Sequence, residues 1–346
     1  MKGYYLKSAI VVGLLVSVIL FSRFASVEKI EEARGFRWTE KKSDPAFLLS
    51  PAAWVDSVLN SLTLEQRIAQ LIMVAAYSNN HRRNEQEVTK LIKEYKIGGL
   101  VFFQGTPYRQ AQLTNFYQSL SGTPLLIAMD AESGPGMRID SAMRYPNQMM
   151  LGAIEDDKMI FNMGSQIAWQ LKRLGVHINF APVIDINNNP LNPVINTRSF
   201  GEDMMAVTRK SLFYMIGMEN NGILAVAKHF PGHGDTEADS HQELPVIHHS
   251  KARLDSLELF PFRELIYNGL SGIMTAHLQI PALDPRDTVP ASLSIYAVDS
   301  LLKKVMGFKG LIFTDALGMK GVSGYYKPVE AAELALKAGN DILLMH

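Results

Sequence analysis

Eight short apolar runs, separated by stretches with helical periodicity, constrain the fold of this chain more than any other feature. Each run is apolar at nearly every position, as strands covered on both faces of a parallel sheet are. They span residues 71–76, 98–103, 125–130, 177–185, 223–229, 272–277, 310–315 and 341–345. Strand and helix patterns that alternate in this way indicate repeated βα units.

Eight such units in a chain of 346 residues favour a closed (β/α)₈ barrel. An open, doubly wound dinucleotide-binding sheet is the main competitor, but six strands would suffice for it and no G-x-G-x-x-G follows the first run. The eighth run closes the sequence, so we expect a barrel that ends at strand 8 and exposes an apolar flank. An additional C-terminal domain, a partner or a shifted element would then cover that flank.

The residues before the first run predict how the domain begins and where the protein works. Thr63 and Glu65 lie where a helix would start. Lys2 and Lys7 precede the uncharged apolar segment 9–21, which is typical of an export signal and shorter than a full membrane span. We expect an exported, periplasmic or extracellular protein, and membrane anchoring through this segment stays open. The predicted parts are a signal peptide or anchor in 1–25, a charged linker in 26–49 and the barrel domain in 50–346.

Composition excludes several classes of function. Lys and Arg together number 34, and so do Asp and Glu, so no net field attracts nucleic acid. The chain has no cysteine, which excludes disulfides, thiolate nucleophiles and cysteine zinc sites. We expect no metal and no cofactor.

Polar residues close five of the eight runs. Active sites of (β/α)₈ barrels lie at the carboxyl ends of the strands. A single Asp at such an end more often caps the following helix, but a set that converges on one rim indicates a functional site. The residues at these ends are Asp130, Asp185, Lys228 with His229, His277 and Asp315.

The segment KHFPGHGDTEADSHQELP, residues 228–245, gathers titratable groups on a loop, because its prolines and glycines prevent regular structure. Within it, Asp239 lies two residues before His241. A histidine beside a carboxylate can give a proton at one step and take one at the next. Asp315, fixed at a strand end, can serve as a nucleophile or as a counter-charge to a developing cation. Together these parts suit cleavage of a glycosidic bond.

Further residues near the predicted rim suit a sugar pocket. Arg138, Arg198, Lys228 and His229 can donate hydrogen bonds to sugar oxygens, and Asp130 can accept them from hydroxyls. The alternative for Arg138 and Arg198 is a role in salt bridges that stabilise loops.

These residues resemble glycoside hydrolase family 3, in its single-domain β-N-acetylglucosaminidase branch. The resemblance runs from about residue 62 to the end of the chain. It is carried by five segments in the family's order, which are MDAESGPGMR (129–138), NTRSFGED (196–203), the loop 228–245, MTAH (274–277) and FTDALGM (313–319).

The resemblance implies a barrel and a retaining, double-displacement mechanism on a GlcNAc-containing glycan, with peptidoglycan fragments as one candidate. It implies Asp315 as the nucleophile and His241, with Asp239 as its partner, as the acid/base. It also implies a set of residues that bind the non-reducing sugar, namely Asp130, Arg138, Arg198, Lys228, His229 and His277. One departure is Ser133, which stands in the segment expected to form the pocket floor, where the family commonly has the first glycine of a pair.

Other functions stay open from sequence. A metal-dependent barrel hydrolase would use His229, His277 and Asp315 as zinc ligands. A non-catalytic wall-binding module would keep the pocket without the chemistry. A β-glycoside phosphorylase would let phosphate compete with water, since a histidine acid/base places no second carboxylate in the path of phosphate.

Overall fold

The structure of the protein is a computed structural model that describes residues 42–49, 53–79, 81–240 and 242–345. The expected export segment, most of the expected linker and His241 lie outside the described residues. In the part that is described, no helix has the length and apolar character needed to cross a membrane.

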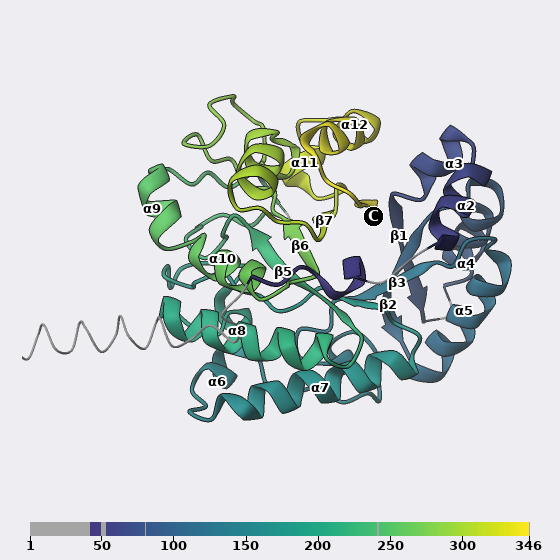
Figure 1. Ribbon diagram of the computed structural model, residues 1–346, viewed down its shortest axis with the longest axis horizontal. Helices are drawn as coiled ribbons and strands as arrows, with labels where there is room; N and C mark the ends of the chain where they lie inside the picture. The colour runs from purple at the N-terminus through teal and green to yellow at the C-terminus, as the bar shows by residue number, and fades with distance from the viewer. Residues whose placement is uncertain (1–41, 50–52, 80, 241, 346) are drawn as a thin grey trace, which may run out of the picture. The chain divides into compact units, whose positions relative to one another are not determined.

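All eight apolar runs contain a strand, and the strands form one parallel sheet in the order β7-β6-β5-β4-β3-β2-β1-β8. An isolated parallel bridge between Phe313 and Ile342 joins β7 to the start of the last strand, so the sheet curves into a nearly closed barrel (Figure 1). The strands are β1 (Ile72–Ser78), β2 (Gly99–Gly105), β3 (Leu126–Met129), β4 (Ile178–Asn179), β5 (Leu224–Phe230), β6 (Gly272–Thr275), β7 (Leu311–Thr314) and β8 (Leu343–Met345). The predicted (β/α)₈ fold is confirmed.

Helices connect the strands and lie outside the barrel, where α7 and α8 run side by side (Figure 1). The α-helices are α2 (Ala53–Ser61), α3 (Leu64–Ala69), α4 (Arg82–Lys90), α5 (Pro107–Leu120), α6 (Gln148–Gly152), α7 (Asp157–Arg173), α8 (Met204–Glu219), α9 (Lys251–Ser256), α10 (Phe260–Tyr267), α11 (Lys320–Ser323) and α12 (Pro328–Ala338). Short 3₁₀ segments are η1 (Ala46–Leu49), η3 (Pro135–Met137), η4 (Asn196–Arg198) and η5 (Ala291–Leu293), and π-helical segments are η2 (Leu91–Tyr95) and η6 (Tyr296–Val305).

The helix start expected near Thr63 is confirmed. Thr63 caps α3, because its side-chain oxygen accepts a hydrogen bond from the Gln66 backbone N–H while the Gln66 side chain accepts one from the Thr63 N–H. Such a capping box stabilises a helix start by about 1 kcal/mol. The helical pattern before β1 is therefore divided into α2 and α3.

The barrel interior is apolar along most of its length. Its core contains buried side chains from strands far apart in the sequence, among them Met73, Val101, Phe180, Met274 and Phe313. The rings of Phe180 and Phe313 meet edge to face with centroids 5.4 Å apart. Because this packing fills the interior, polar side chains are confined to the rim.

Strand β4 is much shorter than the run that predicted it. Pro182 follows soon after and has no N–H to donate to the ladder. The carbonyl oxygens of Ala181 and Pro182 still accept hydrogen bonds from Val226 and Lys228 at 3.0 and 3.2 Å. The segment therefore keeps its place beside β5 and brings Asp185 to the rim.

Strand β8 is better covered than the sequence led us to expect. Leu343 is 1% exposed and packs in a cluster with Val322, Ala331 and Ala335 from α11 and α12. Leu344 points into the barrel core and is 2% exposed. The prediction of an exposed apolar flank is wrong for Leu343, because α11 and α12, which follow β7, extend over it.

Candidate active site

A cavity of about 380 Å³ opens at the carboxyl ends of the strands, above the apolar core. Its lining includes residues that follow or end β3, β5 and β7, as the strand-end argument predicts. Of the nine candidate residues, six line the cavity, namely Asp130, Arg138, Arg198, Lys228, His229 and Asp315.

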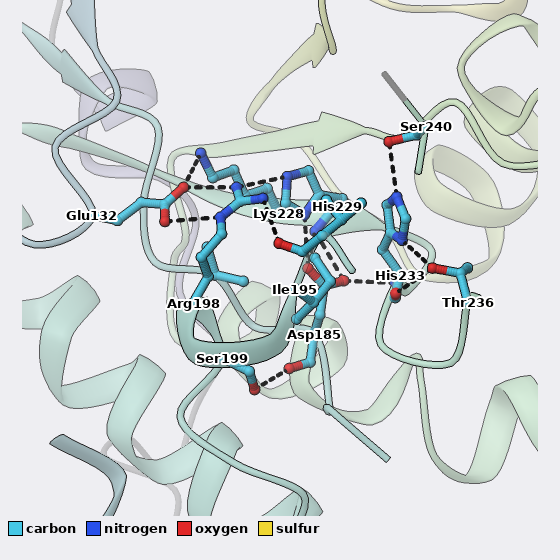
Figure 2. A network of polar contacts seen from close by, with 12 residues as sticks. Glu132, Asp185, Ile195, Arg198, Ser199, Lys228, His229, His233, Thr236 and Ser240 are labelled. Atoms are coloured by element: carbon cyan, nitrogen blue, oxygen red, sulfur yellow. Dashed lines mark hydrogen bonds and ion pairs between the residues drawn. The ribbon is translucent and has the colours of Figure 1, made fainter. Parts of the chain in front are cut away.

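A buried lysine organises one wall of the cavity (Figure 2). Lys228 has a side chain only 2% exposed, and its Nζ lies 2.7 Å from Asp130 Oδ1 and 2.8 Å from Glu132 Oε1. A charge removed from water is tolerated only when it is paired and hydrogen-bonded. The three side chains come from β5 and from the turn after β3, so the contacts tie two strand ends together.

Two arginines extend this arrangement. Arg198 binds Glu132 through two nitrogens, with Nε to Oε2 at 3.1 Å and Nη2 to Oε1 at 2.8 Å. Arg138 reaches Asp130 Oδ2 at 3.1 Å and also donates to the Asp130 backbone carbonyl at 3.1 Å. We call Asp130, Glu132, Arg138, Arg198 and Lys228 the ion-pair network. Both arginines line the cavity and form salt bridges, so the salt-bridge role is present and sugar binding stays a prediction.

The network keeps its carboxylates ionised. Burial would raise the pKa of Asp130, but Lys228 and Arg138 outweigh it and hold that pKa below its usual value. Burial opposes ionisation of Glu132 as well, and Lys228 with Arg198 holds its pKa far below the ordinary range. At neutral pH the wall therefore presents charged oxygens and nitrogens in fixed positions to a polar ligand.

His229 is oriented by a buried carboxylate (Figure 2). Its Nδ1 lies 2.7 Å from Asp185 Oδ2, and a carboxylate can only accept, so Nδ1 donates. Nε2 faces Arg198 Nη2 at 3.3 Å, on the side of the cavity. Asp185 also accepts from the backbone N–H groups of His229 and His233. It thereby fixes both ends of the segment that leaves β5.

Asp315 stands on the rim directly after β7. Its Oδ1 accepts a hydrogen bond from the Ala316 N–H at 2.8 Å. Burial would raise its pKa, but the positive potential of His277, His229 and Lys228 outweighs this and lowers the pKa of Asp315 to about 2. The carboxylate is therefore ionised at neutral pH and available as a nucleophile.

His277 has a different place from the one expected. Its side chain is fully buried, its Nε2 donates to the Ala316 carbonyl at 3.0 Å, and its Nδ1 lies 2.7 Å from Ser292 Oγ. It does not line the cavity. The described contacts of His277 hold the backbone next to Asp315, and its expected sugar contact stays a prediction.

The contacts of His277 also count against the zinc-site alternative. A nitrogen that donates to a carbonyl carries a proton and cannot ligate a metal ion. Throughout the described ranges, no group of three or more His, Asp and Glu side chains is arranged to hold a metal ion.

Residues 232–245, which we call the histidine loop, cross the rim after β5. Ser240 lines the cavity, and its neighbour Asp239 is half-buried. The Asp239 carbonyl accepts from the N–H groups of Gln242 and Glu243 at 2.8 and 3.0 Å, forming a turn. His241 lies outside the described residues, so its expected pairing with Asp239 stays a prediction.

Sequence reasoning missed three groups that the structure places in or behind the site. Glu132 sits at the centre of the ion-pair network, and its only sequence signal was its place two residues after Asp130 in a quoted motif. Asp185 was noted as a strand end but received no role. His233 lay within the histidine loop without a partner that sequence could identify.

Comparisons with known proteins agree with this geometry. The protein-family model described as "Glycosyl hydrolase family 3 N terminal domain" matches residues 63–346. A curated relative, beta-hexosaminidase A of Pseudoalteromonas piscicida, is 40% identical over 282 residues, which cover 75% of this chain and 47% of the relative.

Two solved structures are also similar to this chain. A glycoside hydrolase family 3 β-N-acetylglucosaminidase from a Paenibacillus species has a TM-score of 0.75 at 37% identity, covering 82% of this chain and 55% of that one. A structure titled beta-glucoside phosphorylase BglX has a TM-score of 0.80 at 27% identity, covering 85% of this chain and 54% of that one. The chain thus spans about half the length of these three proteins.

Proposed function

Because this chain belongs to glycosyl hydrolase family 3, we propose that it is a retaining exo-β-N-acetylglucosaminidase. The observation that carries the proposal is Asp315, an ionised carboxylate at the rim of a polar cavity that is also lined by the ion-pair network. The printed names of the beta-hexosaminidase A and the β-N-acetylglucosaminidase support the choice of sugar.

In the first step, an Asp315 oxygen attacks the anomeric carbon and the bond to the leaving oxygen breaks. The leaving oxygen takes a proton from the His241 imidazolium, which Asp239 supports. In the second step, the neutral imidazole removes a proton from water, the water oxygen attacks the same carbon, and the bond to Asp315 breaks. The balance is one water consumed and one sugar released with retained configuration.

The ion-pair network supports the placement of the terminal sugar. Lys228, Arg138 and Arg198 present donors to the cavity, and Asp130 presents acceptor oxygens. These groups are cross-linked before any ligand binds, so little orientation is lost when the sugar arrives. Interactions of this kind with hydroxyl groups lower the barrier only if they strengthen as the sugar ring distorts.

The test is turnover of aryl β-N-acetylglucosaminides by the wild type and by Asp315→Ala, with Asp299→Ala as a matched control at a surface ion pair with Lys304. We expect kcat of Asp315→Ala to fall by ~10⁴-fold and the control to match the wild type. A fluorosugar that slows the second step should add its mass to the peptide containing Asp315. Labelling of another side chain would contradict the assignment, and so would retained activity in Asp315→Ala.

His241→Ala tests the proton donor. Its loss should be large for poor leaving groups and small for 2,4-dinitrophenol, because a good leaving group needs little protonation. Equal losses for both kinds of substrate would exclude the acid role.

Phosphorolysis is the second candidate, favoured by the structural similarity to a β-glucoside phosphorylase. Adding inorganic phosphate to the same assays distinguishes the two reactions. A hydrolase releases the free sugar at an unchanged rate, whereas a phosphorylase releases the sugar 1-phosphate. A wall-binding module without catalysis would bind the sugar and turn over neither kind of substrate.

We also propose that the protein acts outside the cytoplasm, on peptidoglycan fragments or another GlcNAc-bearing glycan. Lys2, Lys7 and the apolar segment 9–21 support export. Fractionation of cells that express the full chain tests it, with extraction by high salt and then by detergent to separate a cleaved signal from an anchor. Recovery of the uncleaved chain in the cytoplasm would contradict export.

A further inference from the structure

His233, at the root of the histidine loop, is a buried histidine that the proposed mechanism does not use. It is 1% exposed and lies behind the cavity, with its ring edge to face against that of His229 at 5.8 Å between centroids (Figure 2). A buried imidazole is usually held by hydrogen bonds, and the partners of His233 show what it can do.

Every polar atom of His233 has a partner. Its backbone N–H donates to Asp185 Oδ1 at 2.7 Å, and its carbonyl accepts from the Asn192 side-chain amide at 2.7 Å. Its Nδ1 lies 2.9 Å from Thr236 Oγ1, and its Nε2 lies 3.0 Å from Ser240 Oγ. The residue is therefore fixed by the barrel on its backbone side and faces the loop with its ring.

We assign the ring proton of His233 to Nδ1 from these contacts. The Thr236 hydroxyl lies 3.3 Å from the His233 carbonyl, to which it can donate, and it accepts from the Asn192 amide, so in this assignment it accepts from Nδ1. Nε2 is then an acceptor, and the Ser240 hydroxyl donates to it. Burial, with His229 nearby, lowers the pKa of His233 to about 4, so the ring is neutral and Nε2 can accept at physiological pH.

Ser240 connects His233 to the cavity and to Asp239. It is buried, lines the cavity and directly follows Asp239. On the barrel side, the same Asp185 carboxylate that holds His233 also holds His229, which lines the cavity. A short path of hydrogen bonds thus connects the sugar-facing His229 to the Asp239 segment through Asp185, His233 and Ser240.

We propose that His233 is a positioning residue. Through its contact with Ser240, it holds the Asp239 segment of the histidine loop at the position relative to the cavity that proton transfer requires. The inference rests on the proposed function, because it assigns Asp239 to the proton-transfer step. It predicts that loss of the contact impairs protonation of the leaving group while attack by Asp315 is unaffected.

The test uses Ser240→Ala, which removes the donor and keeps the four contacts of His233 with Asp185, Asn192 and Thr236. Activity is measured on a pair of β-N-acetylglucosaminides, one with a poor leaving group (phenol) and one with a good one (2,4-dinitrophenol). We expect kcat/KM to fall by ~10-fold on the first substrate and by less than ~2-fold on the second. Glu237→Ala, an exposed position in the same loop, is the matched control and should change neither value.

A merely structural role for Ser240 would lower both activities equally, and that result would overturn the proposal. His233→Gln, whose amide oxygen can replace Nε2 as an acceptor, should lose less than His233→Ala. In an Asp239→Ala background, Ser240→Ala should add no further loss on the phenyl substrate, and additive losses would also overturn it. If the wild type turns over neither substrate, the proposed function fails instead, which separates the two outcomes.

Discussion

The ion-pair network and the histidine loop face the same cavity but are held by different forces. In the network, charged side chains from the ends of β3, β5 and η4 pair with one another, and Lys228 and Glu132 are almost completely buried. In the loop, the ring of His233 makes hydrogen bonds to Thr236 and Ser240, and its backbone makes them to Asp185 and Asn192. One region is held by buried ion pairs between side chains, and the ring contacts of the other are hydrogen bonds to neutral hydroxyl groups.

This difference matches what each region has to do. Hydrogen bonds between charged groups are about twice as strong as neutral ones, and buried ion pairs cannot be broken singly without leaving a bare charge. Under the proposed function, a wall that binds the sugar benefits from that rigidity. A group that transfers a proton would benefit from neutral hydrogen bonds that can break and re-form during a turnover.

The largest expected effect comes from breaking the network at its centre. Glu132→Ala leaves Lys228 and Arg198 buried without their shared carboxylate, so unfolding free energy should fall by about 3–5 kcal/mol. Chemical denaturation measures this decrease in the free energy of unfolding. Glu333→Ala, which removes an exposed pair with Lys337, is the control and should cost less than about 0.5 kcal/mol. Similar losses in both variants would mean that the network is not the rigid part of the site.

The pH dependence of stability should separate the two regions. The pKa of His233 is lowered to about 4 in the folded protein, so the unfolded chain binds more protons between about pH 6.5 and 4. The stability that follows is complete above this window and is lost as pH falls through it, by up to about 1.4 kcal/mol per pH unit.

The carboxylates of the ion-pair network affect stability at lower pH than His233 does. The pKa of Glu132 is lowered, so its contribution is present above its unfolded value and is lost only below about pH 4.5. Denaturation of the wild type and of His233→Gln from pH 7 to 4 tests the assignment, and the variant should lose less stability between pH 6.5 and 5. Parallel curves would show that another group titrates in that window.

The smallest expected effect lies at the outer edge of the loop. His249 Nε2 contacts Asp235 Oδ2 at 2.7 Å, and both side chains are about a quarter exposed. Asp235→Asn should change stability by less than about 1 kcal/mol and turnover by less than ~2-fold, because exposed pairs contribute little. Thermal melts and aryl-glycoside assays check both. A large loss of turnover would mean that the edge of the loop, and not only His233, controls the site.

The fold could be predicted because its signal is periodic. Each buried strand is apolar at successive positions, and helical stretches separate the eight runs, so the barrel and the rim residues Asp130, Lys228 and Asp315 follow directly. The exceptions are local. Pro182 shortens β4, and Leu343 is covered by α12 in place of a helix that the pattern would have placed there.

The site could be predicted only in part, because the direction of a side chain in a turn follows no periodic pattern in the sequence. Glu132 and Asp185 are buried carboxylates, and sequence alone does not say that a lysine or a histidine lies beside them. His277 ends an apolar run as Asp315 does, yet its ring points behind the rim toward Ser292 and Ala316. Only the three-dimensional packing separates a residue that faces the ligand from one that supports it.

The bridge between Phe313 and Ile342 has a consequence for the order in which the protein is made. Thr314 donates to the Ile342 carbonyl at 3.0 Å and Leu317 to the Leu344 carbonyl at 2.9 Å, so the chain on either side of Asp315 is anchored to residues about thirty positions further on. While a ribosome is still adding these residues, at about 5–20 per second, β7 is an open edge. Lys228, Asp130 and Glu132 are synthesised well before the contacts between β7 and β8 can form. The segment that carries Asp315 is thus secured only after β8 has been made, and nascent chains cut short before β8 lack these two contacts.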